Sequence, residues 1–339
     1  MCIRLAVVGF RHAHIWDLCR HAQEMDDIEI VAACEEDPVA QAEAASKGVV
    51  TITHRDFDEM LATVDCDAIA VGDYFAKRGS LIIRALSQGK HVISDKPVCT
   101  SLHELSEIEK LSAEKGLKVG CMLGTRDAPP SIGVRNLVRQ GVIGEIHAIS
   151  FNGQHPLFLG TRPAWYFEPG KHGGTINDIA IHAIDAIPWI TGLRFTVINA
   201  ARCWNAFAPE FPHFEDAGQM MLTMDNGCGV LGDVSYFAPD SIGYSSPFYW
   251  RMTFWGRQGV IETSRVANDI TVALNGEREV KSEPLPEGHP GGYLNSFIRD
   301  IKGELGEDEL CTEQVLRASR TALMIQQAAD AHAREVALS

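Results

Sequence analysis

The first part of the chain alternates between short apolar runs and segments with helical spacing. The apolar runs are typical of strands buried in a parallel sheet. They cover residues 3–9, 28–34, 49–53, 68–71, 91–94 and 119–123. The segments between them that carry helical patterns cover residues 14–25, 38–47, 80–88 and 102–115. Strand–helix alternation with short connections predicts an α/β domain of the Rossmann type, with a doubly wound parallel sheet.

After about residue 123 the pattern becomes rich in strands that lack regular intervening helices. The strand-like runs cover residues 145–153, 196–203, 218–224, 227–236 and 251–255. Asn226-Gly227 predicts a hairpin with a type I′ turn, because this pair tolerates positive φ. Residues 312–334 predict a closing helix. We therefore expect a Rossmann domain over residues 1–123 and an α+β domain with an open, mostly antiparallel sheet over residues 124–339.

Composition and charge limit the partners of this chain. Its 339 residues are enough for two cores. The net charge of −15 disfavours nucleic acid and anionic lipid as partners. No run approaches the eighteen apolar residues of a membrane helix. The nine cysteines form no C-x-x-C pair, so we expect reduced thiols and a cytoplasmic location.

The loop after the first apolar run is where a Rossmann domain binds a dinucleotide. Its usual pattern is G-x-G-x-x-G, and here only Gly9 remains, because Arg11 and His14 replace the other two glycines. Arg11 and the N-terminus of the following helix can hold a phosphate. Glu35, which comes twenty-one residues after His14, can accept hydrogen bonds from the adenosine ribose.

The same loop leaves two other interpretations open. The broken glycine pattern also suits a Rossmann domain whose cofactor site is damaged or abandoned. His12 and His14 share one face of an extended segment, as metal ligands often do, but the sequence offers no Cys or carboxylate partner nearby. We therefore predict no metal site.

Two later segments carry the candidate catalytic residues. Lys96 directly follows the apolar run 91–94, and ligands of open α/β sheets bind beyond the carboxyl ends of strands. Asp178 and His182 are four residues apart in a pattern that predicts a helix from about Thr175, so they share one helical face. Histidine can act as a base near neutral pH, and Asp185 falls near the same face.

These motifs together resemble the Gfo/Idh/MocA family of oxidoreductases over most of the chain. Asp95-Lys96-Pro97 resembles the Glu-Lys-Pro segment of that family. The helix segment from Gly173 to Asp185 resembles its Gly-Gly-x-x-x-Asp-x-x-x-His-x-x-Asp pattern. The run from Gly141 to Ile146 resembles the turn that enters the second domain, and Arg126 resembles an arginine that follows the sixth strand.

The resemblance implies NAD or NADP as cofactor, a sugar, polyol or related hydroxyl compound as substrate, and Lys96, Asp178 and His182 as the catalytic set. The expected cofactor contacts are Gly9, Phe10, Arg11, His12, Glu35, Asp73, Lys96 and Arg126. The chain departs from the family at Gly72-Asp73-Tyr74, where relatives often have Thr-Pro-Asn, and near Arg78, where they have histidine. Residues that precede the catalytic helix can line a polyol pocket, namely His155, Arg162, Trp165, Tyr166 and His172.

We predict an NAD-dependent oxidoreductase that removes hydride from a hydroxyl-bearing carbon, with either Lys96 or His182 as the ultimate base. Two alternatives remain. One is a lyase or glycosidase-type enzyme that retains its NAD and uses transient oxidation. The other is a non-catalytic sensor that binds dinucleotide.

Two further expectations concern cofactor choice and assembly. Glu35, Glu36 and Asp37 disfavour the 2′-phosphate of NADP, and residues 34–46 contain no cation to offset them, so NAD is expected. The open sheet carries apolar runs around Met221 and Leu231 that need a cover, so we expect a homodimer or homotetramer.

Overall fold

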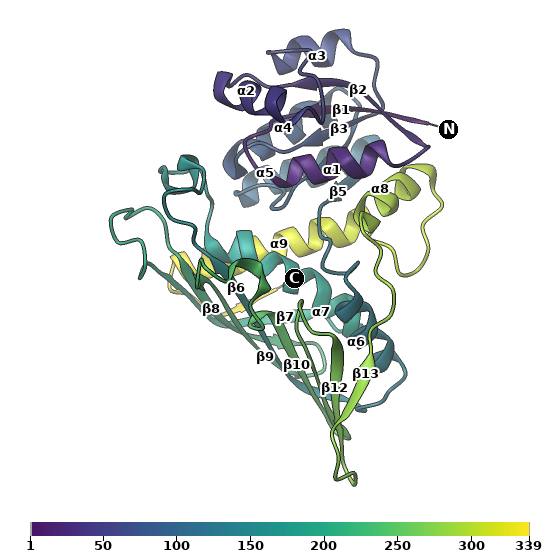
Figure 1. The fold of residues 1–339 in the computed structure, drawn as a ribbon, viewed down its shortest axis with the longest axis vertical. Helices are drawn as coiled ribbons and strands as arrows, with labels where there is room; N and C mark the ends of the chain where they lie inside the picture. Colours follow the sequence, from purple (N-terminus) through teal and green to yellow (C-terminus); the bar gives the residue numbers. More distant parts are fainter. Residues whose placement is uncertain (1, 339) are drawn as a thin grey trace.

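The computed structural model describes residues 2–338 and contains two sheets, each with its own hydrophobic core. The N-terminal parallel sheet and its helices form the upper part of the molecule in Figure 1, and the C-terminal sheet lies below them. The long helix α9 (Thr312–Asp330) lies between them. Within residues 2–338 no helix combines the length and the apolar composition needed to cross a membrane.

The N-terminal sheet has five parallel strands in the order β2-β1-β3-β4-β5, which confirms the predicted Rossmann architecture. The strands are β1 (Ile3–Val8), β2 (Ile28–Cys34), β3 (Ala68–Val71), β4 (His91–Ser94) and β5 (Val119–Cys121). The helices are α1 (His14–Gln23), α2 (Pro38–Lys47), α3 (Phe57–Thr63), α4 (Phe75–Ser87) and α5 (Leu102–Lys115). Local signals set their ends: Asp37 caps the N-terminus of α2, and Gly48 ends it with φ 63°.

The strand predicted at residues 49–53 is not formed, so the sheet has five strands instead of six. This segment reaches β2 only at its end, where Thr53 and His54 both donate a backbone N–H to the Ala33 carbonyl. Val50 and Ile52 pack against the core as loop residues. An apolar run can thus be buried without joining the hydrogen-bond ladder. The helix predicted at 80–88 also differs, because α4 already begins at Phe75.

The C-terminal sheet has nine strands in the order β13-β12-β11-β10-β6-β9-β8-β7-β14, and only β6 and β9 pair in parallel. This confirms the open, mostly antiparallel sheet. The strands are β6 (Ile146–Pro156), β7 (Phe195–Trp204), β8 (Ala217–Met224), β9 (Gly229–Ala238), β10 (Tyr249–Gly256), β11 (Gly259–Thr263), β12 (Asp269–Leu274), β13 (Lys281–Pro284) and β14 (Arg334–Ala337). The remaining elements are α6 (Pro129–Arg139), the 3-10 turns η1 (Ala164–Phe167) and η3 (Gly243–Ser245), the π-helical turn η2 (Ile176–Ala180), α7 (Ile181–Thr191) and α8 (Gly292–Lys302).

The hairpin between β8 and β9 forms where Asn226-Gly227 predicts it, but with a different turn. Met224 N–H donates to the Cys228 carbonyl at 2.9 Å, which leaves a three-residue loop. In this loop only Gly227 has a positive φ, of 83°. The turn is therefore a three-residue loop with glycine in the left-handed region, a common hairpin connection, and not a type I′ turn.

The closing helix α9 joins the two cores. Its first half, around Val315 and Leu323, packs in the N-terminal core, while Ile325 and Ala329 pack in the C-terminal core. The helix ends at Asp330, four residues earlier than predicted, and β14 then pairs with β7. Because one rigid helix packs in both cores, it fixes the edge of the parallel sheet relative to the C-terminal sheet.

Candidate active site

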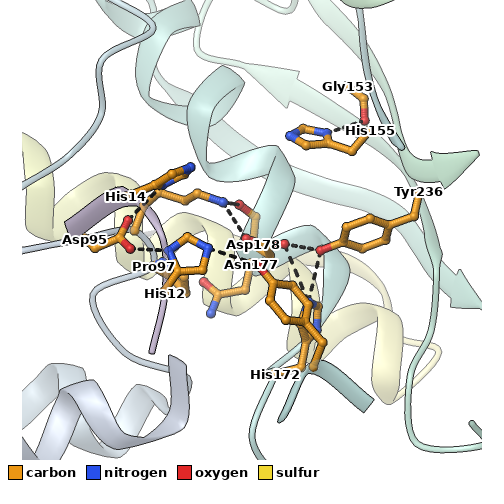
Figure 2. A network of polar contacts seen from close by, with 12 residues as sticks. His12, His14, Asp95, Pro97, Gly153, His155, His172, Asn177, Asp178 and Tyr236 are labelled. Carbon is orange, nitrogen blue, oxygen red and sulfur yellow. Dashed lines mark hydrogen bonds and ion pairs between the residues drawn. The ribbon is translucent and has the colours of Figure 1, made fainter. Parts of the chain in front are cut away.

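Lys96 and Asp178 form a polar contact between the two domains. Figure 2 shows Asp178 within the network of polar contacts around it. Lys96 lies just beyond β4, and Asp178 belongs to η2, the turn that precedes α7. Lys96 Nζ lies 2.5 Å from Asp178 Oδ1 and 3.1 Å from the Asp178 carbonyl oxygen. Both side chains are buried. The structure thus brings together two of the three predicted catalytic residues as a buried ion pair.

The second oxygen of Asp178 is held by residues from the C-terminal domain. The Tyr236 hydroxyl donates to Asp178 Oδ2, and His172 Nε2 lies 3.1 Å from that hydroxyl and 3.5 Å from Oδ2. Burial alone would raise the pKa of the Asp178 carboxyl, but Lys96 and His172 outweigh it and hold the pKa well below its usual range. Asp178 is therefore an ionised carboxylate fixed from three sides.

Tyr236 is a residue of this site that the sequence did not single out. It lies on β9, where Val230, Val234 and Tyr236 are all buried on the face of the sheet that points to the helices. This period of two was the available signal, because a tyrosine at an inward position of an otherwise apolar strand needs a partner for its hydroxyl.

His182 lies on the first turn of α7 and is half-buried, but it makes no hydrogen bond to Lys96 or Asp178 within the described chain. Its Nδ1 is a buried polar atom without a hydrogen-bond partner among residues 2–338. Burial, and next the positive charge of Lys96, holds the pKa of His182 well below its usual value. The imidazole is therefore neutral at physiological pH, and its predicted catalytic role stays a prediction.

The glycines that precede this turn are required by its packing. Gly173 has φ 79° and Gly174 has φ 97°. A Cβ on Gly173 would come within 2.1 Å of the Thr100 side chain, and one on Gly174 within 2.1 Å of the Gln326 side chain. The pair lets the backbone that carries Asp178 approach the Rossmann domain and α9 closely.

His155 lies in an aromatic enclosure on the C-terminal sheet. Its ring packs edge-on against Tyr249 and Trp250, at centroid distances of 5.1 and 6.0 Å. Burial, and next the charge of Lys96, lowers the pKa of His155 to about 3. In Figure 2, His155 and Tyr236 both lie to the right of Asp178. His155 is thus a neutral, buried side chain, and its predicted substrate contact stays a prediction.

Three other predicted substrate residues connect the C-terminal domain to the site. The Arg162 guanidinium donates to the carbonyls of Leu157 and Pro156 and lies over the rings of Tyr166 and Tyr236, at 4.7 and 4.9 Å. The two others contact the predicted cofactor loop directly. Trp165 Nε1 donates to the Arg11 carbonyl at 2.9 Å, and the Tyr166 hydroxyl lies 2.9 Å from His12 Nε2.

The predicted cofactor loop turns tightly over β3. Gly9 has φ 80°, and a Cβ there would come within 2.6 Å of Asp73, so glycine is required. The Phe10 N–H donates to Glu35 Oε2 at 2.6 Å, and the Asp37 N–H donates to Glu35 Oε1 at 2.8 Å. Glu35 is almost fully buried. In this conformation both its oxygens bind backbone, so the structure does not present it openly to a ribose.

A cluster of charges covers the carboxyl ends of β1, β2 and β3. Arg11 Nη2 lies 2.8 Å from Glu36 Oε1, and Arg11 Nε lies 3.3 Å from Asp73 Oδ1 without a hydrogen bond. Lys77 of α4 pairs with Glu36 and lies 3.3 Å from Asp73 Oδ2. Arg11, which has a buried N–H lacking an acceptor among residues 2–338, lies in the loop that leads into the N-terminus of α1, where a phosphate group of a dinucleotide can bind.

Asp95 has three partners that the sequence did not reveal. The buried Arg78 donates from Nη2 to Asp95 Oδ2 at 2.9 Å, and His12 Nδ1 contacts the same oxygen. His14 Nδ1 lies 3.1 Å from Asp95 Oδ1. Arg78 also donates to the carbonyls of Asp73, Lys96 and Pro97, so it fixes the segment that presents Lys96. Asp95, which lies eighty-three residues after His12, supplies the carboxylate partner that the sequence did not show near His12 and His14.

Arg126 engages residues of the C-terminal part of the chain. Its Nε lies 2.7 Å from Asp185 Oδ2, its Nη2 lies 2.5 Å from Asp185 Oδ1, and its Nη1 lies 2.8 Å from Gln314 Oε1. This bidentate, buried ion pair connects the end of the Rossmann domain to α7. The predicted cofactor contact of Arg126 stays a prediction.

Comparisons with known proteins agree with this architecture. Residues 3–123 match the family model described as "Oxidoreductase family, NAD-binding Rossmann fold", and residues 132–262 match that of the GFO/IDH/MocA C-terminal domain. The chain therefore belongs to the Gfo/Idh/MocA family.

Curated relatives of the chain carry dehydrogenase names. It is 25% identical over 248 residues to an inositol 2-dehydrogenase of Arthrobacter sp., with 71% of this chain and 69% of that protein covered. It is 26% identical over 207 residues to a D-xylose dehydrogenase of Paenarthrobacter nicotinovorans, with 57% and 53% covered. For this relative and an uncharacterized oxidoreductase of Synechocystis, of which 52% is covered, the chain spans about half the length.

Solved structures share the whole fold. A putative oxidoreductase from Erwinia carotovora atroseptica superposes with a TM-score of 0.85 at 25% identity, covering 96% of this chain and 98% of that one. An inositol dehydrogenase homolog from Azotobacter vinelandii, solved with NADH and myo-inositol, superposes with a TM-score of 0.80 at 18% identity, covering 100% and 98%. The second likeness is one of fold alone.

Proposed function

We propose that this protein is an NAD-dependent dehydrogenase that oxidises a hydroxyl group of a sugar, polyol or related small compound. The observation that carries the proposal is the buried Lys96–Asp178 pair at the carboxyl edge of the parallel sheet, beside a neutral His182 whose Nδ1 has no partner among residues 2–338. These are the groups that binding and deprotonating an alcohol requires. The names of the inositol and xylose dehydrogenases among its relatives support the substrate class.

Each residue has a defined part in this proposal. NAD would supply the hydride acceptor when bound, and the predicted cofactor loop with Gly9 and Arg11 would hold it. His182 Nδ1 takes the proton of the substrate hydroxyl, because the imidazole is neutral and this nitrogen has no hydrogen-bond partner among residues 2–338. Lys96 Nζ stabilises the negative charge that develops on the substrate oxygen. Asp178, which Tyr236 and His172 hold in place, positions Lys96.

The proposal is tested by mixing the protein with NAD and a panel of sugars and polyols and following absorbance of NADH. Accumulation of NADH with one class of substrate is the expected result. Conversion of a substrate without NADH accumulation would favour the lyase or glycosidase-type alternative. Tight NAD binding with no conversion of any substrate would favour the non-catalytic sensor.

We infer a cytoplasmic location from the state of the thiols. All nine cysteines are free. Cys2 is exposed, Cys203 and Cys311 are partly buried, and the other six are buried. Burial raises the pKa of Cys34 and Cys99 to about 12, so these thiols are protonated and unreactive. Free thiols in this number suit a reducing compartment.

NAD is expected to bind more tightly than NADP by about tenfold. Residues 34–46 contain no cation, but the fold brings Arg11 and Lys77 to Glu36, so two cations face the three carboxylates of Glu35, Glu36 and Asp73. The excess of one negative charge disfavours a 2′-phosphate by roughly 1.4 kcal/mol, which is a factor of about ten. Titration calorimetry with both cofactors measures the ratio.

The variant Glu36→Ala sharpens this cofactor test. Removing Glu36 frees Arg11 and Lys77 to bind a phosphate, so the preference for NAD is expected to fall or reverse. Glu43→Ala, on the exposed side of α2, is the matched control and is expected to leave the ratio unchanged. Equal or tighter binding of NADP by the unmodified protein would contradict the assignment of this cluster to the adenosine ribose.

A homodimer or homotetramer is expected to form through the face of the C-terminal sheet that points away from the helices. Met221 and Leu231 lie opposite each other on β8 and β9 and are 47% and 59% exposed. Leu231→Asp is expected to weaken self-association by at least about thirtyfold, because burying an unpaired carboxylate in an apolar interface costs about 2 kcal/mol or more. Light scattering over a concentration series measures the change.

The control for the assembly test is Val39→Asp, because Val39 is also exposed but lies on α2 of the Rossmann domain. It is expected to leave the mass unchanged. A monomeric mass for the unmodified protein at micromolar concentration would contradict the predicted assembly.

A further inference from the structure

Two imidazoles and a carboxylate converge beneath the cofactor loop. One ring nitrogen of His12, one ring nitrogen of His14 and one oxygen of Asp95 all lie within 4.8 Å of one another. His14 Nδ1 and Asp95 Oδ1 are 3.1 Å apart, and the two imidazole rings meet edge-on with centroids 4.5 Å apart. Ligand atoms bound to a common ion at 2.0–2.2 Å in tetrahedral geometry are about 3.4 Å apart. Small adjustments of these side chains therefore place all three atoms around one ion.

The side chains around the three residues hold them as metal ligands are usually held. The Tyr166 hydroxyl lies 2.9 Å from His12 Nε2, the ring nitrogen that points away from the cluster (Figure 2). Arg78 donates to Asp95 Oδ2, which leaves Oδ1 facing His14. Metal-binding histidines and carboxylates in proteins have such partners on their outer atoms, which fix the tautomer and the orientation of the ligand.

One side of the cluster is closed by an ion pair, and another is open to solvent. Arg78 Nη2 lies 2.9 Å from Asp95 Oδ2. Arg78 already balances the charge of Asp95, so neither imidazole is needed for charge neutrality. The side chain of His14 is 43% exposed, which gives an ion a route from solvent.

We propose that His12, His14 and Asp95 form a binding site for a divalent transition-metal ion of the class of Zn²⁺, Co²⁺ or Fe²⁺. Two imidazoles and one carboxylate are a ligand set that these ions accept, and it leaves coordination positions open. The proposal rests on the geometry of these residues and not on the dehydrogenase activity.

The charge balance of the site indicates what would occupy the open positions. Asp95 and Arg78 together are neutral, so a divalent ion adds two positive charges to a largely buried place. Hydroxide or an oxygen-rich anionic group then offsets this charge. If the proposed function also holds, a substrate with a carboxylate or adjacent hydroxyl oxygens fits this site better than a simple alcohol does.

The test is a titration of the full, untagged protein with Co²⁺ in the absence of any nucleotide, after treatment with a chelator that is then removed. We expect visible ligand-field bands that saturate at one Co²⁺ per chain and disappear when Zn²⁺ displaces the ion. His14→Gln is expected to bind Co²⁺ at least about tenfold more weakly, because even outer-shell substitutions cost 10–100-fold. It is expected to fold normally, since His14 is partly exposed.

Two further variants complete the design. His147→Gln is the matched control, because His147 is an exposed histidine that also lies beside a carboxylate. Its Nε2 is 3.6 Å from an oxygen of Glu145, and both residues are far in sequence from the loop with His12 and His14. It is expected to bind Co²⁺ like the unmodified protein. Tyr166→Phe, which removes the partner of His12, is expected to weaken binding by about tenfold. The proposal is overturned if the unmodified protein shows no saturable binding of Co²⁺, or if the His14→Gln variant binds Co²⁺ as tightly as the unmodified protein.

This titration separates the metal site from the proposed function. A protein that binds Co²⁺ but converts no sugar or polyol with NAD would keep the metal site and lose the dehydrogenase proposal. A protein that produces NADH but binds no Co²⁺ would do the reverse.

Discussion

Lys96→Ala is expected to lower kcat by about 10²–10³-fold while the protein remains folded. Lys96 Nζ is the only ammonium group bound to Asp178 among the described residues, and it faces the carboxyl edge of the parallel sheet. Removing a fixed positive charge that stabilises a developing oxyanion costs about this much, and His182, the proposed base, is left in place. Asp178 keeps Tyr236 and His172 as partners, so the buried carboxylate is not left alone.

The measurement is steady-state kinetics on the substrate found with the sugar and polyol panel, together with thermal unfolding. Lys110→Ala is the control, because Lys110 is exposed on α5 and lies outside the site. It is expected to leave kcat unchanged. A Lys96→Ala protein that keeps a kcat near that of the unmodified enzyme would show that Lys96 is not catalytic.

Arg78→Met is expected to lower the free energy of unfolding by about 3–5 kcal/mol. Arg78 is fully buried, pairs with the fully buried Asp95, and donates to three carbonyls around the Lys96 segment. Breaking a buried pair from one side costs about that much, because the remaining charge stays without compensation. The same substitution is expected to reduce activity, since the backbone that carries Lys96 loses its support.

Urea unfolding of the two proteins measures this difference in free energy. Arg84→Met is the matched control on the same helix, because Arg84 pairs with Asp58 at the surface and such pairs contribute about 0–1 kcal/mol. If Arg78→Met were no more destabilised than Arg84→Met, Asp95 would have to be protonated, or neutralised by His12 and His14, in the folded protein.

Much of the fold followed from the sequence because it depends on local pattern. The five parallel strands stand where short apolar runs end at glycine or polar residues, and α2 and α5 begin at the capping residues Asp37 and Ser101. The antiparallel character of the second sheet followed from strand-like runs without helices between them. The exception at residues 49–53 has a physical reason. Burial of apolar side chains produces the apolar run in the sequence. A strand also needs a neighbouring strand edge with free backbone hydrogen-bonding groups, and this segment reaches β2 only at Thr53 and His54.

The candidate site was only half visible in the sequence. Lys96, Asp178 and His182 lie at the ends and turns of recognisable elements, so local pattern and family resemblance were enough to select them. The contact between Lys96 and Asp178 itself spans eighty-two positions. Its formation depends on how α9 packs in both cores and on the glycines that let the Asp178 turn approach the Rossmann domain.

The sequence by itself determined the two kinds of sheet and, through the Lys96 and Asp178 segments, the resemblance to the family, because hydrophobic periodicity and short motifs act over a few residues. Only the tertiary structure decided that Tyr236 holds Asp178, that Arg11 and Lys77 meet Glu36, and that Asp95 completes a set with His12 and His14. These partners come from different strands and helices, and nothing in the spacing of polar residues specifies which of them share one buried place. That choice is made when the cores close, because burial forces each charge and hydroxyl to find a partner within reach.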